Sequence, residues 1–430
     1  MTVKVIGAGL AGCEAVYQLS KRGINVKLYE CKPLIKSPAH RSDTFAELVC
    51  SNSLKSDDIY TAGGLLKAEL RMLDSLLIRI ADSVRVPAGS ALAVDRNLFT
   101  EKVTGFICSL PNVEIIREVV SDWNENEITV IATGPLTIGG LSDAINLRLG
   151  ENMHFYDAAA PIVSAESIDF SSAFVGDRYG KGNGDYVNCP MTKEEYTAFY
   201  EALVNADRIE IHGFENNEVF EGCMPVEIMA KRGFDTLRFG PMRPVGLYDR
   251  DAKKPYAVVQ LRRENAAGDM YNIVGFQTNL KFGEQKRVFG MIPALKNAEF
   301  MRYGVMHRNS FINAPKVIDR HFSVRRYPNV FIAGQLSGVE GYVESIASGL
   351  VCGINAANAA SCKSYAEFPA TTVIGALSGY LERENACFQP MNANFGILPP
   401  PENKTRDKSE NKRRQVERSL KDLENIRTMI

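Results

Sequence analysis

The sequence predicts an α/β fold in which a Rossmann-like domain built on a parallel sheet is interrupted by a smaller α+β insertion domain. Three observations predict it: a strand, glycine loop, helix and strand at the N-terminus, a basic central segment with strands of its own, and a downstream strand and small-residue helix that resume the first pattern. The chain has 430 residues, 45% of them hydrophobic, which is enough for two cores.

The N-terminal residues predict a βαβ unit. Residues 3–6 (VKVI) are an apolar run typical of a buried parallel strand, and residues 11–22 have the apolar spacing of a helix. Gly23 ends that helix, and residues 25–29 form the second strand. Such a unit is the usual opening of a Rossmann-like domain.

Further elements of the first domain follow later in the sequence. Residues 60–80 have apolar positions at three- and four-residue steps and predict one long helix, and 128–132 (ITVIA) predicts a central strand. Far downstream, 329–333 (NVFIA) predicts a strand that returns to the same sheet, followed by a Gly/Ser/Ala-rich helix from Val343 to Ala360. The intervening residues are therefore an insertion.

We expect the insertion to begin at a glycine-rich loop near residue 181. The helix after this loop starts with a capping pair, Thr192 and Glu195, and strands are expected at 256–261 and 271–276. The predicted boundaries are 1–180 and 325–400 for the first domain, 181–324 for the insertion and 401–430 for a charged tail. A solvated helix is favoured over an RNA-binding arm for the tail.

Composition excludes several classes of protein. No apolar stretch reaches the length of a membrane span and no secretory signal opens the chain, so we expect a cytoplasmic protein. The nine cysteines contain no CxxC and the five histidines show no ligand spacing, so neither a metal site nor a disulfide framework is expected. Net charge is −1, yet residues 225–320 hold 17 Lys plus Arg against 9 Asp plus Glu, which suggests a polyanionic partner; a solvated charged surface is an equal alternative on composition alone.

The motif GAGLAG predicts a dinucleotide-binding loop. Gly7 permits a tight turn, Gly9 lets the backbone approach a pyrophosphate, and Gly12 allows close packing of helix and strand. The helix N-terminus favours the anionic phosphates, and Glu30, at the end of the second strand, can accept hydrogen bonds from a ribose diol. The loop residues expected to bind the cofactor are Gly7, Ala8, Gly9, Leu10, Ala11 and Gly12. A glycine-rich turn without a ligand is the alternative.

The downstream segment favours FAD over NAD as the dinucleotide. In residues 329–357 a strand leads into a glycine-dense loop and a helix of small residues, which would supply N–H groups beside the flavin. Its expected contacts are Gly334, Gln335, Gly341 and Tyr342; packing of a small-residue helix is the alternative explanation. Tyr342 could stack on a base or folate, or serve the core.

Two cysteines have sequence neighbours that are unusual for buried thiols. Cys50 is flanked by polar residues in FAELVCSNSLKS, and Cys223 precedes a basic stretch, FEGCMPVEIMAKRGFDTLRFGPMRPVGL. Positive neighbours lower the pKa of a thiol and favour the nucleophilic thiolate. Inert buried thiols are the alternative for both residues.

Several long motifs resemble one enzyme family, the folate- and FAD-dependent tRNA (uracil-5-)methyltransferases. The resemblance runs from Val3 to about Pro401 and is carried by GAGLAG, PAHRSDTFAELVCSNSL, YDAAAPIV, KGNGDYVNCPMTKEEY, VVQLRRENAAGDMYNIVGFQTNLKFGEQKRVF, AGQLSGVEGYVESIASGLVCGINAA and QPMNANFG, besides the two cysteine segments. Ser90 departs from the commoner threonine in GSALAVDR, without touching a presumed reacting group.

The resemblance implies the fold just described and a specific reaction. NAD(P)H reduces the FAD, the flavin takes a methylene from 5,10-methylenetetrahydrofolate, and this carbon becomes the C5 methyl of the T-loop uridine at tRNA position 54. Cys223 would add to uracil C6, and Cys50 would guard the flavin adduct or remove the C5 proton.

The basic segment supplies the expected contacts to tRNA. Arginines can pair with phosphates, and those expected to do so are Arg232, Arg238, Arg243, Arg262, Arg263 and Arg308. No stable protein partner is inferred. The alternatives are the same chemistry on a ribosomal RNA uridine, a related flavoprotein that modifies wobble uridine and has longer chains, a small-molecule flavin oxidoreductase, and a non-catalytic RNA-binding flavoprotein.

Overall fold

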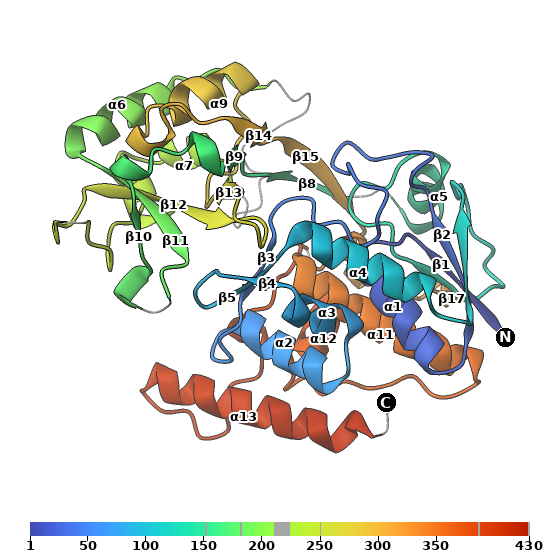
Figure 1. The fold of residues 1–430 in the computed structure, drawn as a ribbon. Coiled ribbons are helices and arrows are strands. Elements are labelled where there is room, and N and C mark those ends of the chain that lie inside the picture. The colour runs from blue at the N-terminus through green and yellow to red at the C-terminus, as the bar shows by residue number, and fades with distance from the viewer. Residues whose placement is uncertain (151–152, 181–182, 210–223, 250, 386–387, 429–430) are drawn as a thin grey trace.

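The computed structural model describes residues 1–430 except 151–152, 181–182, 210–223, 250, 386–387 and 429–430, and it divides into two adjoining domains (Figure 1). The larger domain is built on a six-stranded sheet of order β16-β17-β7-β1-β2-β6. All its pairings are parallel except that of β16 with β17. The strands are β1 (Thr2–Ile6), β2 (Asn25–Glu30), β6 (Val113–Arg117), β7 (Thr129–Ile131), β16 (Ser323–Val324) and β17 (Tyr327–Ile332).

Two helices pack closely beside this sheet. Helix α1 (Leu10–Lys21) follows β1, and α11 (Tyr342–Ala360) follows β17 more than three hundred residues later. A Cβ on Gly349 would lie 2.2 Å from the carbonyl oxygen of Ala11, so only glycine permits this approach of the two helices. The predicted βαβ unit, returning strand and small-residue helix are confirmed, with each helix beginning one residue earlier than expected.

The predicted long helix at 60–80 is two helices, α2 (Ala62–Met72) and α3 (Leu76–Ser83). Asp74 adopts a left-handed φ of 56°, and the Ser75 hydroxyl caps α3 by accepting the N–H of Ile78. The prediction of one helix was wrong because apolar spacing continues across the break. Nearby lie α4 (Arg96–Cys108), α5 (Gly140–Leu149) and a small sheet of β3 (Ser53–Ser56), β4 (Arg85–Val86) and β5 (Ala91–Val94).

The smaller domain has its own antiparallel sheet, of order β10-β11-β12-β13-β9-β14, and its own apolar core. The strands are β9 (Ile162–Ser164), β10 (Phe174–Val175), β11 (Tyr186–Met191), β12 (Ala257–Arg263), β13 (Met270–Ile273) and β14 (Phe300–Arg302). The helices are α6 (Lys193–Val204), α7 (Val226–Ala230), α8 (Thr236–Phe239) and α9 (Phe282–Phe289). Thr192 and Glu195 form the predicted capping box at the start of α6.

The second sheet starts and ends earlier than the expected boundaries of 181 and 324. Strands β9 and β10 precede residue 181, and β16, at Ser323–Val324, already belongs to the first sheet. An antiparallel ribbon of β8 (Met153–Ala158) and β15 (Met306–Phe311) carries the chain between the domains, with the short helix α10 (Ala314–Val317) beyond it. The strands of two and three residues are too short to show a period in sequence.

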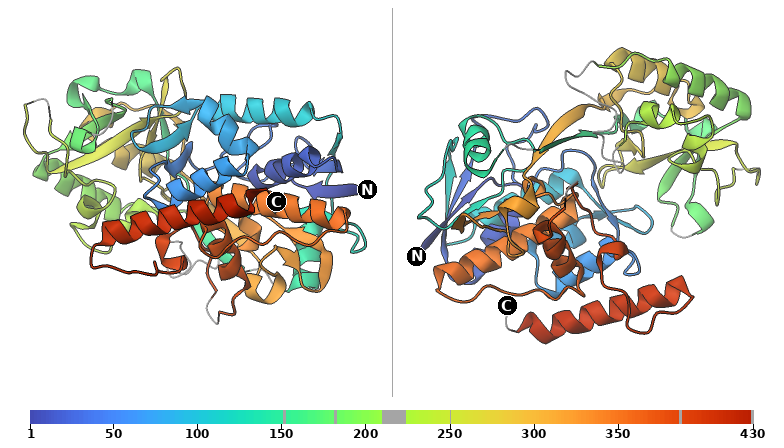
Figure 2. Two further views of the ribbon diagram at one scale, coloured as in Figure 1. Left: turned by 90° about the horizontal axis from the view of Figure 1, so that it is seen from below. Right: turned by 180° about the vertical axis from the view of Figure 1, so that it is seen from behind.

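The charged tail contains α13 (Lys408–Arg427), which lies along the first domain (Figure 2). The expected helix is present and most of its residues are exposed or half-buried, but one face is buried, through Gln415, Val416, Ser419 and Leu423. The Ser419 hydroxyl donates to Glu69 on α2, whose carboxylate also accepts two N–H groups at the start of α12 (Val373–Glu382). Within the described ranges, no helix is long and apolar enough to cross a bilayer.

Candidate functional site

The GAGLAG loop forms a cradle that glycine alone can build. Gly7 has a φ of 99°, and a Cβ there would lie 2.6 Å from the carbonyl oxygen of Ala132. A Cβ on Gly12 would lie 1.8 Å from the carbonyl oxygen of Gly7, whereas at Gly9 the nearest atom would be 3.9 Å away. Gly7 and Gly12 are therefore required by close packing, and Gly9 leaves open space beside the helix end.

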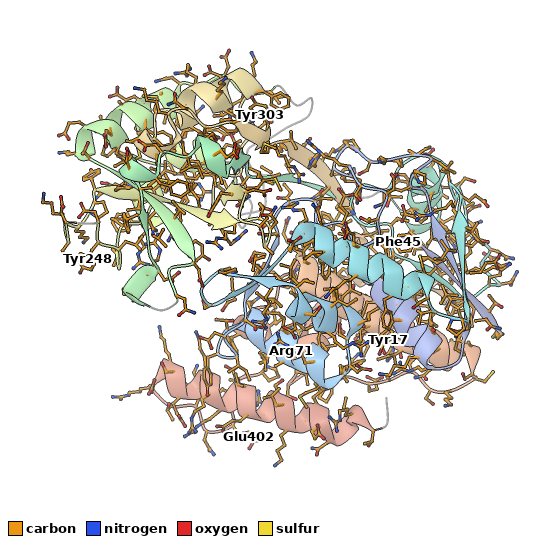
Figure 3. All side chains as sticks on the ribbon, viewed as in Figure 1. Tyr17, Phe45, Arg71, Tyr248, Tyr303 and Glu402 are labelled. Atoms are coloured by element: carbon orange, nitrogen blue, oxygen red, sulfur yellow. The ribbon has the colours of Figure 1, made fainter. Side chains whose placement is uncertain are left out.

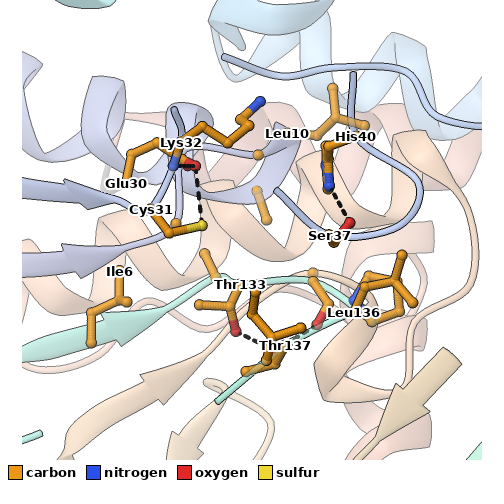
Figure 4. A pocket seen from close by; sticks show the side chains of 18 of the residues that line it. Ile6, Leu10, Glu30, Cys31, Lys32, Ser37, His40, Thr133, Leu136 and Thr137 are labelled. Atoms are coloured by element: carbon orange, nitrogen blue, oxygen red, sulfur yellow. Dashed lines mark hydrogen bonds between the residues drawn. The ribbon is translucent and has the colours of Figure 1, made fainter. Parts of the chain in front are cut away.

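The start of α1 fits an anionic group. Gly9 is its N-cap and provides no side-chain hydrogen bond, and the first turn holds no acidic residue. Gly9, Leu10 and Ala11 line a cavity, so the N–H groups and positive dipole end of α1 are available to a phosphate there (Figure 4).

Glu30 is held in place at the carboxyl end of β2. It is 5% exposed and lines the same cavity; its Oε2 accepts the N–H of Ala8 at 2.7 Å, and its Oε1 accepts the N–H of Lys32 at 2.9 Å. Oε1 also accepts the Cys31 thiol at 3.5 Å, whereas Oε2 keeps a second lone pair, so Glu30 can still accept a ribose hydroxyl. Figure 4 shows Glu30 and Lys32 on the opposite side of this cavity from Thr133, Leu136 and Thr137.

The segment after β17, from Gly334 to Tyr342, completes the cavity. Gly334, with a φ of 75°, donates its N–H to Ser348 Oγ at 2.7 Å, and Gly334, Gln335 and Tyr342 line the wall beside α1. The structure thus brings together most residues expected to bind the cofactor, namely Gly7, Gly9, Leu10, Ala11, Glu30, Gly334, Gln335 and Tyr342. Ala8 and Gly12 support the loop from behind, and Gly341 lines the adjoining cavity.

A second cavity adjoins the first and contains Cys50. The two share the lining residues Val49, Pro135, Leu136, Gln335, Tyr342 and Ser345. The Tyr342 hydroxyl accepts the N–H of Cys50 at 2.7 Å, and the Cys50 thiol donates to Asp157 Oδ2 at 3.4 Å. Burial, and next the charge of Asp157, raises the pKa of the Cys50 thiol well above its ordinary value. Tyr342 therefore holds the thiol loop, besides lining both cavities.

Three arginines hold the loop around Cys50 through hydrogen bonds to residues 48–52. Arg96 donates to the carbonyl of Leu48, and Arg302 donates to that of Val49. Arg262 donates to Ser51 Oγ at 2.8 Å and to Asn52 Oδ1 at 3.1 Å. Arg262 and Arg302 belong to the second domain, so both domains shape this loop.

Arg262 does not fit the expected role of a surface phosphate contact. It is 6% exposed, lines the second cavity and is committed to the Cys50 loop. A sequence pattern does not distinguish it from Arg263, which follows it on the same strand with the opposite pleat direction and is half-buried.

The remaining predicted RNA contacts are dispersed. Arg238 lies 3.6 Å from the ring centroid of Tyr256 and pairs with Asp235, so part of its surface is used within the domain. Arg232, Arg243 and Arg308 are exposed. Figure 3 shows Tyr248, five residues after Arg243, at the outer edge of the second domain.

Cys223 lies outside the described residues. Three residues further along the chain, Val226 donates its N–H to the carbonyl of Gln277 at 2.7 Å, and Gln277 lines the second cavity. The residues that directly follow Cys223 in the sequence therefore reach the edge of the cavity that contains Cys50.

Three carboxyl groups of the second cavity, those of Asp157, Glu340 and Glu344, were missed from the sequence. Asp157 is 7% exposed and Glu340 is 6% exposed, and burial together with the charge of Asp157 raises the pKa of Glu340 to about 8. Asp157 and Glu340 lie among small or apolar neighbours, in FYDAAA and GVEGY, and such a setting is the signal that could have found them. No group of His, Cys, Asp and Glu with the geometry of a metal site exists among the residues with a described position.

Comparison with known proteins decides the family. The family model of glucose inhibited division protein A matches residues 2–364. Methylenetetrahydrofolate–tRNA-(uracil-5-)-methyltransferase TrmFO of Acetivibrio thermocellus is 56% identical, over 98% of this chain and 97% of its own. The enzyme of the same name from Streptococcus agalactiae is 54% identical, over 98% of each chain. This chain belongs to the methylenetetrahydrofolate–tRNA-(uracil-5-)-methyltransferase family.

The methyltransferase family is FAD-dependent, and the cradle described above fits that cofactor. The α1 N-terminus suits a diphosphate, Glu30 suits a ribose, and the apolar wall of Pro135 and Leu136 continues toward Cys50. A crystal structure of GidA from Aquifex aeolicus superposes with a TM-score of 0.74 at 16% identity, over all of this chain and 73% of that one. At this identity the likeness confirms the predicted fold alone.

Proposed function

We propose that this methyltransferase-family protein methylates C5 of the uridine at position 54 in the T-loop of tRNA. The carbon donor is 5,10-methylenetetrahydrofolate, and NAD(P)H reduces the FAD. One observation carries the proposal: the Cys50 thiol lies in a cavity that shares a wall with the glycine cradle. A nucleotide cofactor in the cradle and a base in the second cavity would therefore meet beside a thiol.

The cradle side of the site binds and orients. The N–H groups at the start of α1 hold the diphosphate, and Glu30 holds the adenosine ribose. When bound, FAD supplies the electrons and carries the one-carbon unit. The apolar residues shared by the two cavities exclude water from the reacting groups.

The two cysteines have different proposed roles in the reaction of uracil. C5 of uracil is a poor nucleophile until a thiolate adds to C6 and produces an enolate. Cys223, next to a basic stretch in the sequence, is the candidate nucleophile because positive neighbours favour the thiolate. The pKa of Cys50 is raised, so this thiol is protonated at rest and is the poorer nucleophile; its proposed role therefore concerns the proton that leaves C5.

Two findings support tRNA as the substrate. The relatives at 54–56% identity are named as tRNA methyltransferases, and the second domain carries most of the excess positive charge of residues 225–320. A T-loop base is stacked within a folded RNA, so it must be turned out of the stack to reach the cavity, at a cost of a few kcal/mol.

Isotope transfer tests the reaction. With NADPH and undermodified tRNA, carbon label in the methylene of methylenetetrahydrofolate should enter the RNA, and label on S-adenosylmethionine should not. Mapping the labelled nucleotide decides between position 54, a wobble position and, with ribosomal RNA fragments, a ribosomal uridine. Transfer from S-adenosylmethionine, or label at another position, would contradict the proposal.

Cysteine variants test the assignment of the thiols. Cys50→Ala and Cys223→Ala should each retain FAD and lose methylation, and Cys108→Ala, at an exposed cysteine of α4, should keep both. Full turnover by both of the first two variants would return these thiols to a structural role.

A further inference from the structure

Asp157 is a buried carboxylate in direct contact with the Cys50 thiol. It lies on β8, in the ribbon that joins the two domains, and its Oδ2 accepts the thiol proton at 3.4 Å. Packing does not explain an acidic side chain at this position, because Asp157 is followed by a run of buried alanines in the apolar segment YDAAAPIV. Burying a carboxylate costs free energy that a hydrogen bond from a neutral thiol offsets only in part.

The surroundings fix the thiol in front of this carboxylate. The Tyr342 hydroxyl accepts the N–H groups of Cys50 and Ser51, at 2.7 and 3.2 Å, and Arg302 holds the carbonyl of Val49. The thiol is therefore positioned by its backbone on both sides.

Other ionisable groups around the pair leave Asp157 as the natural proton acceptor. Glu340, whose charge also raises the pKa of the thiol, is bound by the side-chain amide of Gln335, and Glu344 in the same cavity pairs with Lys55 at 3.5 Å. His307 lies opposite Asp157 in the β8–β15 ladder. The positive charges that interact with the thiol are those of Arg302 and Arg96. The positive charge of the two arginines stabilises partial negative charge on the sulfur while the two protons move.

We propose that Asp157 accepts the thiol proton of Cys50 while Cys50 takes the C5 proton of uracil, so that the two residues form one proton relay. The inference rests on the proposed function. In the step, the S–H bond of Cys50 breaks as a bond from Asp157 Oδ2 to that proton forms. The sulfur takes the proton from C5, and the electron pair of the C5–H bond passes into the C4 enolate. Asp157 releases its proton to water when the product leaves.

A concerted relay agrees with the state of the thiol. Burial and the charge of Asp157 keep Cys50 protonated at neutral pH, so a free Cys50 thiolate would be too scarce to act as a base. Moving both protons together avoids that species. Asp157 acts through Cys50 and need not touch the base.

The experiment combines two measurements on the holoenzyme with Asp157→Asn, which keeps the shape of the side chain and removes its charge. The first is the release of tritium from C5 of tRNA carrying 5-tritiated uridine, which should fall at least about 100-fold in kcat with little change in tRNA affinity. The second is the pH dependence of iodoacetamide labelling of the Cys50 peptide, read by mass spectrometry. Its midpoint should move down by about one pH unit or more.

Matched variants complete the test. Asp157→Glu keeps the charge and should retain a high labelling midpoint and part of the turnover. Asp169→Asn removes an exposed carboxylate of the same chain that is bonded to Ser171 and Ser172, and it should change neither readout. If Asp157→Asn does not bind FAD, Asp157→Glu alone decides. Because this variant keeps the negative charge, a labelling midpoint below that of the parent would overturn the proposal.

The outcomes separate this inference from the proposed function. Parental tritium release by Asp157→Asn, or an unmoved labelling midpoint, would overturn the relay. The labelling needs neither tRNA nor folate, so it reports on the pair independently of the reaction. Absence of methylated tRNA with the parent enzyme would instead overturn the proposed function.

Discussion

Glu30 supports the glycine loop and at the same time lines the cradle proposed for the cofactor. Its carboxylate receives the N–H of Ala8 from the glycine loop and the N–H of Lys32 from the end of β2, and it lines the cradle. Sequence spacing predicts Glu30 as a ribose ligand, and its bond to the glycine loop follows only from the geometry. The glycine loop and the proposed ribose contact therefore depend on the same residue.

Replacement of Glu30 should weaken FAD binding. Glu30→Ala removes a charge-assisted acceptor and should cost on the order of 1–3 kcal/mol, or roughly a 5- to 150-fold higher Kd for FAD. Titration of the apoprotein with FAD, followed by flavin fluorescence, measures the change. Glu30→Gln keeps one acceptor oxygen and should lie between the two; equal affinity of a folded Glu30→Ala and the parent would contradict the proposed ribose contact.

At the scale of elements, the contact between α1 and α11 should tolerate no added methyl group. Gly349→Ala would place a Cβ 2.2 Å from the carbonyl oxygen of Ala11, in the first turn of α1, so the helices must separate. Overpacking of this kind costs about 1–3 kcal/mol or more in the free energy of unfolding, and it should also lower FAD affinity. Denaturant unfolding and FAD titration measure the two effects.

A glycine in open space provides the matched control. Gly105 lies within α4, and a Cβ there would meet no atom within 4 Å. Gly105→Ala should therefore be neutral or raise the free energy of unfolding by up to about 1 kcal/mol. Similar effects of the two substitutions would show that the helix contact is looser than described.

A second element-scale prediction concerns the buried carboxyl of Glu69, which joins α2, α12 and α13. Burial raises the pKa of Glu69 to about 7 from its ordinary 4.5, so the folded state favours the protonated form. The resulting stability is fully present below about pH 4.5 and is lost as the pH rises through 7, a change of roughly 3 kcal/mol.

Glu69→Gln should remove this dependence. Between pH 5 and 7 the free energy of unfolding of the parent should fall relative to that of the variant, because only the parent loses a proton from this site. Denaturant unfolding at several pH values gives the difference curve. A difference that stayed constant across this window would mean that Glu69 is ionised throughout.

At the scale of the whole molecule, the docking of the two domains shapes the site. Asn52, from the first domain, donates its amide to the carbonyls of Arg263 and Glu264 in the second, and Arg96 pairs with Glu264. These bonds explain why a thiol loop of one domain depends on side chains of the other.

The exposed arginines of the second domain should govern tRNA binding and its response to salt. Arg243→Glu should weaken tRNA binding and reduce the slope of log K against log salt, by about 0.7–0.9 for each phosphate that is no longer neutralised. The affinity should be measured against potassium chloride, with Arg79→Glu on α3 of the first domain as a control of equal charge change. A flat salt dependence in the parent, or equal effects of the two variants, would place the RNA elsewhere.

Local patterns were sufficient for part of the fold. The βαβ unit, the returning strand and the Thr192 capping box were predicted because apolar spacing, glycine and cap residues act on neighbours within a few positions. The break at Asp74 and the two- and three-residue strands were not, because they are too short or are set by distant residues.

The order of amino acids alone was enough to predict the family, the α/β class and the glycine cradle with Glu30 beside it, and to single out Cys50 as a candidate for the chemistry. The folded chain was needed to show that Asp157 and Arg302 meet the Cys50 loop, that Arg262 is buried, and that α13 packs on α2. The physical reason is distance along the chain: the first group of features depends on local spacing, whereas the second depends on residues 107 to 350 positions apart that sheet order and domain docking bring together.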